Sequence, residues 1–211
     1  FGIEHSTHAI QANRNIRILN IQKNEAEAAK VISAVQDRLT DHDYYTHRID
    51  DVREEMTHLC DVSGYCGDLI YLPQAESAIE LTAKVALIGV DGWADGGYGD
   101  WIRSKVWLSD YELIRDLVPY SKTRTHLVAK LREIAAAEAS KLHHKLAAAL
   151  PAFDTVIVAT HVPPFVEAAW HEGKQSEPDY LPHFASRFMG DALREQVLHY
   201  GHQRVLTLCG H

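Results

Sequence analysis

The stretch Thr155-Val156-Ile157-Val158-Ala159-Thr160-His161-Val162-Pro163-Pro164 decides the fold class of this chain. Its first five residues are an apolar, mostly β-branched run of strand length that ends at polar residues and two prolines. Such a run is typical of a buried strand. Because ligands of layered α/β proteins gather where strands end, His161 marks a place where chemistry is expected.

Strands and helices alternate on both sides of this stretch. Apolar runs of strand length occupy 16–21, 69–72, 85–90 and 205–208, with 78–81 as a further candidate. Helical spacing of apolar residues occupies 24–39, 49–59, 123–150 and 189–200. The alternation predicts an α/β layered domain. We expect one domain over 1–211, with a helical insertion at about 101–150.

Composition limits the classes of function that remain. With 46% apolar and 24% charged residues, the 211-residue chain has the balance of an ordinary globular protein. It has no run of 18 apolar residues, which argues against a membrane-spanning helix and a membrane partner. The balance of 21 basic and 29 acidic residues gives a net charge of -8 and disfavours nucleic acid as a partner.

Two residue types carry information on compartment and chemistry. The three cysteines, Cys60, Cys66 and Cys209, lack CxxC spacing, so they favour a reducing, cytoplasmic location over a disulfide framework. The chain also holds 14 histidines, an excess that directs attention to metal or proton chemistry.

Three histidines stand at or beside the ends of predicted elements. These are His42 between Asp41 and Asp43, His161 after the strand at 155–159, and His211 after the strand at 205–208. One such histidine alone is also typical of a surface loop. Two at strand ends, beside turn residues, favour a ligand set, since imidazole and carboxylate together suit zinc, iron and manganese.

A family resemblance follows from these motifs. Thr160-His161-Val162-Pro163-Pro164 and Cys209-Gly210-His211 resemble the last two blocks of the calcineurin-like metallophosphoesterase superfamily, and Thr40-Asp41-His42-Asp43 resembles its Gly-Asn-His-Asp block. The segments 89–96 and 170–173 resemble one bacterial branch of that superfamily. The resemblance covers about 41–211. It implies a layered metallophosphoesterase-like sandwich of sheets flanked by helices.

The resemblance also implies a function. It implies a metal-dependent hydrolase in which two divalent ions (Mn, Fe or Zn) supply a hydroxide that cleaves a small phosphomonoester or phosphodiester. Asp41, His161 and His211 would bind metal. His42 would act as general acid toward the leaving group, with Asp43 orienting its ring.

Two further segments are candidates for the substrate side of such a site. The glycine-rich run 91–101 contributes Asp91 and Trp93, and the segment 170–173 contributes His171. The alternative for the first segment is a flexible loop packed by two tryptophans. The alternative for the second is a surface helix end.

The sequence also departs from the family pattern. No Asp-x-His block is present, the strand at 16–21 ends without the bridging aspartate, and the final histidine would lie beyond His211. One interpretation is that the sequence lacks rim loops and the C-terminal end of a complete enzyme. The other is an inactive scaffold or regulator. We favour the first, because decay would not remove whole loops and leave the other blocks intact. A nuclease is the weaker alternative, since no basic stripe is present.

Overall fold

The computed structural model describes residues 48–62, 70–171, 173–201 and 203–210. Its centre is a four-stranded sheet in the order β1-β2-β3-β6. These strands are β1 (Ile79–Thr82), β2 (Val85–Gly89), β3 (Thr155–Thr160) and β6 (Arg204–Cys209). The last three run parallel and β1 is antiparallel to β2. The described residues therefore form an α/β fold with a mixed sheet flanked by helices, which confirms the predicted fold class at that level.

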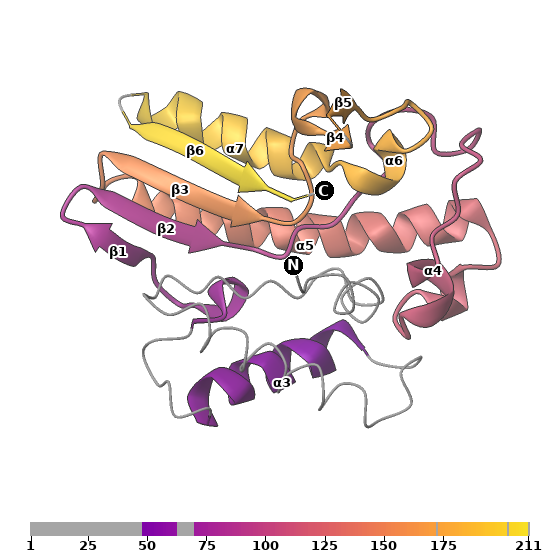
Figure 1. The fold of residues 1–211 in the computed structure, drawn as a ribbon, viewed down its shortest axis with the longest axis horizontal. Coiled ribbons are helices and arrows are strands. Elements are labelled where there is room, and N and C mark those ends of the chain that lie inside the picture. Colours follow the sequence, from indigo (N-terminus) through magenta and orange to yellow (C-terminus); the bar gives the residue numbers. More distant parts are fainter. Residues whose placement is uncertain (1–47, 63–69, 172, 202, 211) are drawn as a thin grey trace.

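Two helices cover one face of the sheet. Helices α5 (Arg124–Ala149) and α7 (Arg187–Tyr200) lie side by side across β2, β3 and β6 (Figure 1). Val156 and Val158 of β3 are fully buried and belong to the same core as Leu142 and Leu146 of α5. Every second residue of β3 is buried, as the period of a strand requires when one face packs on helices.

The remaining described elements are short, apart from one helix. They are α3 (Ile49–Val62), α4 (Asp110–Leu113), α6 (Leu181–Phe184), the hairpin of β4 (Trp170–His171) and β5 (Lys174–Gln175), and the 3-10 helices η1 (Leu72–Gln74), η2 (Val118–Tyr120) and η3 (Val166–Ala168). Helix α3 confirms the helix predicted at 49–59. Among the described helices, none is long and apolar enough to cross a membrane.

Side-chain caps explain why the two long helices begin where they do. Thr123 is extended, and its hydroxyl accepts a hydrogen bond from the N–H of His126, so α5 begins at the next residue. Ser186 caps α7 in the same way by accepting from the N–H of Met189. Gly201 ends α7 with a φ of 50°, a left-handed conformation that glycine adopts readily.

Two predictions are corrected. The strand predicted at 69–72 is wrong for its described part, because Ile70 is only an isolated bridge residue and Leu72–Gln74 forms η1, where Pro73 fixes its own φ and offers no N–H to a ladder. The suggested helix end at 170–173 is also wrong, because Trp170–His171 is a strand of a hairpin.

Other predictions are confirmed or stay open. The strands predicted at 78–81, 85–90, 155–159 and 205–208 and the helices at 123–150 and 189–200 are confirmed within a few residues. The strand predicted at 16–21 and the helix at 24–39 lie outside the described residues. That 101–150 forms an insertion, and that 1–211 forms one domain, stay predictions.

Candidate functional site

The carboxyl ends of the three parallel strands meet at one edge of the sheet. The backbone N–H of His161, after β3, donates to the carbonyl of Asp91, after β2, over 3.0 Å. The N–H of Gly210, after β6, is shared between the carbonyls of Thr160 at 3.2 Å and His161 at 3.1 Å. Three segments far apart in the sequence are therefore neighbours at this edge, which we call the strand-end edge.

The predicted catalytic and metal-binding residues fall largely outside the described part of the chain. Asp41, His42, Asp43 and His211 all lie there, so among these candidates only His161 is placed. Within the described residues, no group of three or more His, Cys, Asp or Glu side chains could hold a metal ion. The described residues thus bring one imidazole to the strand-end edge and do not form a metal site by themselves.

Asp91 is at the expected place, but its carboxylate is already engaged. The side chain is 1% exposed, and Oδ2 accepts a hydrogen bond from Nε of Arg53 over 2.8 Å. The other oxygen accepts from the hydroxyl of Tyr71 over 2.9 Å. Burial and the nearby carboxylate of Glu138 raise the pKa of Asp91, while the guanidinium of Arg53 opposes that rise. Burial and Asp91 also raise the pKa of Tyr71, which keeps its donating proton.

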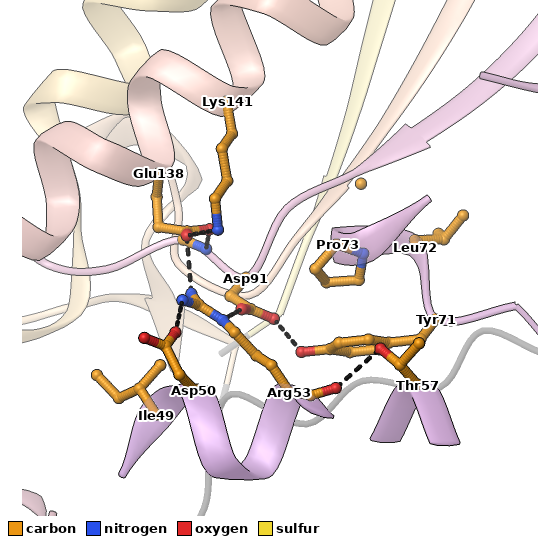
Figure 2. A network of polar contacts seen from close by, with 12 residues as sticks. Ile49, Asp50, Arg53, Thr57, Tyr71, Leu72, Pro73, Asp91, Glu138 and Lys141 are labelled. Carbon is orange, nitrogen blue, oxygen red and sulfur yellow. Dashed lines mark hydrogen bonds and ion pairs between the residues drawn. The ribbon is translucent and has the colours of Figure 1, made fainter. Parts of the chain in front are cut away.

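Arg53 connects Asp91 to two further carboxylates, as Figure 2 shows. Its Nη2 donates to Glu138 of α5 over 2.7 Å and its Nη1 to Asp50 of α3 over 3.1 Å. Glu138, also 1% exposed, accepts from Lys141 over 2.9 Å and from the N–H of Gly92 over 3.4 Å. We call Arg53, Asp91, Glu138 and Tyr71 the buried ionic network.

A small cavity lies beside this network, between α3 and α5. Its volume is about 190 Å³, and its lining includes Asp50, Arg53, Lys130, Glu133 and Lys141. The whole lining holds four carboxylates and three cations, and Lys130 is paired with Glu133 over 2.9 Å. No single sign of charge dominates the cavity, so its lining does not select a charged ligand.

The loop 91–101 is held at two points and packed by two tryptophans. Asp95 is fully buried, and its carboxylate accepts from Gly97 N and from Phe188 N in the first turn of α7, both over 2.7 Å. Trp93 and Trp101 are buried in one apolar cluster with α5. The packing suggested as the alternative for this loop is therefore confirmed, and hydrogen bonds fix the loop in addition.

The third substrate-side candidate lies elsewhere. His171 is exposed in β4, and Trp170 beside it is 51% exposed, with its indole N–H donating to the carbonyl of Glu167. Among the contacts of the described residues, none joins His171 to the strand-end edge. The roles expected for Asp91, Trp93 and His171 in binding substrate stay predictions.

Sequence reasoning missed the buried ionic network, although one signal was available. Leu131, Ala135, Glu138 and Leu142 follow one another at helical spacing and all are buried. A carboxylate on an otherwise apolar stripe must find a cation or a donor, because an unpaired buried charge is costly. Glu138 could thus have been singled out, whereas nothing in the sequence identifies Arg53 as its partner.

A second buried polar group, His183, also went unassigned. Its Nδ1 lies 2.7 Å from the hydroxyl of Tyr111, and its Nε2 lies 2.9 Å from Oγ of Ser104. Ser104 already donates to the carbonyl of Asp179, so it accepts from Nε2–H, and Nδ1 accepts from Tyr111. Burial, with a smaller effect of Arg124, lowers the pKa of His183 to about 4. The imidazole is neutral and fully hydrogen-bonded, which suits a structural role.

Comparisons with known proteins assign no relative to this chain. No protein-family model matches it, and neither the curated proteins nor the solved structures gave a match. Its function is therefore inferred from its own residues and their arrangement.

Proposed function

We propose that this chain is a metal-dependent hydrolase of phosphomonoesters or phosphodiesters. The observation that carries the proposal is the contact of Gly210 with Thr160 and His161. Gly210 belongs to the Cys209-Gly210-His211 motif, so this contact supports the pairing of that motif with the motif that contains His161. An α/β fold with a mixed sheet is compatible with the proposed metallophosphoesterase-like sandwich.

The proposed roles follow the family resemblance. Asp41, His161 and His211 would hold divalent transition-metal ions, which would supply a hydroxide nucleophile. His42 would protonate the leaving oxygen, and Asp43 would hold its ring. Trp93 and His171 are proposed on the substrate side. Because both oxygens of Asp91 accept hydrogen bonds from other side chains, we assign Asp91 to shaping this side through its main chain.

The test uses the natural full-length protein, purified without chelator. Elemental analysis before and after reconstitution with Mn should find up to about two ions per chain. The reconstituted protein should hydrolyse p-nitrophenyl phosphate or bis-p-nitrophenyl phosphate, and chelation should stop it. Replacing His42 by Ala should lower turnover about 100-fold or more and leave the metal content unchanged.

One specific observation favours the second candidate, an inactive scaffold. The buried carboxylate of Asp91 at the strand-end edge is paired with an arginine. Absence of bound metal after Mn reconstitution, together with absence of hydrolysis of both esters, would decide for the scaffold.

A further inference from the structure

Arg53 of α3 is the meeting point of three segments. Its guanidinium contacts Asp91 after β2, Glu138 in α5 and Asp50 in the first turn of α3, at 2.8, 2.7 and 3.1 Å (Figure 2). The Arg53 side chain is 11% exposed, and those of Asp91 and Glu138 are 1% exposed. All three nitrogens of the guanidinium are thus used, two of them on carboxylates that water does not reach.

Further contacts hold both ends of the peptide group that joins Asp91 to Gly92. Its carbonyl accepts from the N–H of His161, and the following N–H, of Gly92, donates to Glu138. The side-chain carboxylate of Asp91, next to this peptide group, is held by Arg53 and Tyr71. Without Arg53, Asp91 would lose its ion pair and Glu138 would keep only Lys141, so these two buried carboxylates of like charge would move apart or take up a proton.

We propose that Arg53 is a positioning residue for the strand-end edge. It joins helix α3 to the carboxylates of Asp91 and Glu138 and so holds the Asp91–Gly92 peptide group in its place beside His161. The effect on hydrolysis rests on the function proposed above. The effect on the main chain does not, because it follows from the contacts of Arg53 alone.

Charge alone does not explain this arrangement. A buried ion pair often stabilises a protein no more than apolar residues of the same volume would. Here the planar guanidinium of Arg53 holds three carboxylates at fixed angles, and the ammonium of lysine cannot reproduce that geometry. Replacing Arg53 by Lys therefore separates the geometry of the contact from its charge.

The experiment compares Arg53→Lys and Arg53→Gln with a matched control pair, Arg103→Lys and Arg103→Gln. Arg103 has an 88% exposed side chain and faces Asp100 at 3.6 Å on the surface. Hydrogen exchange measured by mass spectrometry should show exchange about tenfold or more faster in 91–97 of both Arg53 variants, with α7 unchanged beyond its first turn, which Asp95 contacts. The Arg103 variants should exchange as the wild type does.

Turnover gives the second readout in the same proteins. With p-nitrophenyl phosphate and Mn, kcat of both Arg53 variants should fall about tenfold or more, because small misplacements are costly in catalysis. KM should stay within about twofold of the wild-type value. A role confined to stability would leave kcat of the folded protein unchanged.

Three results would overturn the proposal. One is normal exchange in 91–97 of Arg53→Lys. Another is exchange that rises equally in 91–97 and α7, and the third is an unchanged kcat of the folded variants.

Should the Arg53 variants not fold, Asp91→Asn replaces them, since it keeps the shape of the side chain and removes its charge. Normal exchange of 91–97 in that variant would overturn the proposal equally. If the wild type binds no metal and hydrolyses no ester, the proposed function fails and the exchange comparison still decides.

Discussion

The N–H of His161 donates to the carbonyl of Asp91 over 3.0 Å, two residues beyond the last paired residues of β2 and β3. The ladder that pairs Gly89 with Ala159 therefore continues past the strands into the loops that follow them. Backbone hydrogen bonds of a sheet are among the least mobile contacts of a protein. The two residues from which chemistry is expected at this edge are thus held main chain to main chain.

The first prediction concerns His161. His161→Ala should leave the fold intact and lower Mn binding about tenfold or more, because a lost imidazole leaves an ion under-coordinated. His144→Ala is the matched control, since His144 is exposed on α5. Titration calorimetry with Mn on the full-length protein measures both affinities. Equal affinities of wild type and His161→Ala would remove His161 from the ligand set.

A second prediction concerns Gly92, which has a φ of 76°. A Cβ at this position would overlap Oγ1 of Thr160, so Gly92→Ala should lower the free energy of unfolding by about 3 kcal/mol. Gly173 has nearly the same φ, 77°, and nothing within 4 Å of its would-be Cβ. Gly173→Ala should therefore cost only about 1 kcal/mol, the conformational part. Urea unfolding of both variants gives the comparison.

Removal of the Thr160 hydroxyl provides the control for this steric reason. Oγ1 of Thr160 is buried and accepts or donates no hydrogen bond within the described structure. Adding Thr160→Ala to the Gly92→Ala protein should therefore restore much of the free energy of unfolding that Gly92→Ala alone loses. If the double variant is as unstable as Gly92→Ala alone, backbone conformation and not overlap explains the loss.

The sheet and its two covering helices could be predicted because their signals are local. Apolar runs such as 155–159 have the length of strands, and Thr123 lies where a cap for α5 is needed. The error at 69–72 has a local cause too. Leu72 looks like a strand residue, but Pro73 after it turns the chain, and Leu72 packs against Gly89 instead.

The buried ionic network could not be predicted, because its partners are distant in the sequence. Arg53, Asp91 and Glu138 lie on different elements, and each has several oppositely charged candidates along the chain. Asp91 shows the consequence. Its position at a strand end was evident from the sequence, whereas its pairing with Arg53, which leaves no open carboxylate, depends on the placement of α3 beside the loop that follows β2.

The third prediction concerns Lys145 of α5. Its Nζ donates to the carbonyls of Leu72 at 2.7 Å, Gly89 at 2.9 Å and Pro73 at 3.2 Å, which ties η1 to the end of β2. Burial and the charge of Lys141 lower the pKa of Lys145 to about 8, so the ammonium form prevails at pH 7. Lys145→Met should lower the free energy of unfolding by about 3 kcal/mol, because three carbonyls lose their donor.

The control for Lys145 is Lys84→Met. The Lys84 side chain is 78% exposed and pairs with Asp154 on the surface at 3.0 Å. Its loss should change the free energy of unfolding by less than about 1 kcal/mol. Similar losses in the two variants, measured by urea unfolding at pH 7, would mean that the three carbonyl contacts add no stability.

The last prediction concerns the pH dependence that His183 confers. In the folded protein its pKa is lowered to about 4, below the ordinary value of 6.5. Between pH 6.5 and about pH 4, His183 is protonated in the unfolded chain and neutral in the folded protein. The free energy of unfolding therefore falls as the pH falls through this range. Protonation would also turn Nδ1 into a donor facing the hydroxyl of Tyr111 and add a charge near Arg124. The loss amounts to at most about 3 kcal/mol between pH 7 and pH 4.

His183→Gln isolates this contribution, because an amide can accept from Tyr111 and donate to Ser104 but does not titrate. Urea unfolding at pH 7, 6, 5 and 4 should show the wild type losing more stability toward low pH than the variant does. His144→Gln, which removes an exposed histidine of the same chain, should follow the wild type. If wild type and His183→Gln lose stability in parallel down to pH 4, then His183 takes up its proton without cost. In that case the two hydrogen bonds to Tyr111 and Ser104 do not hold the imidazole in its neutral form.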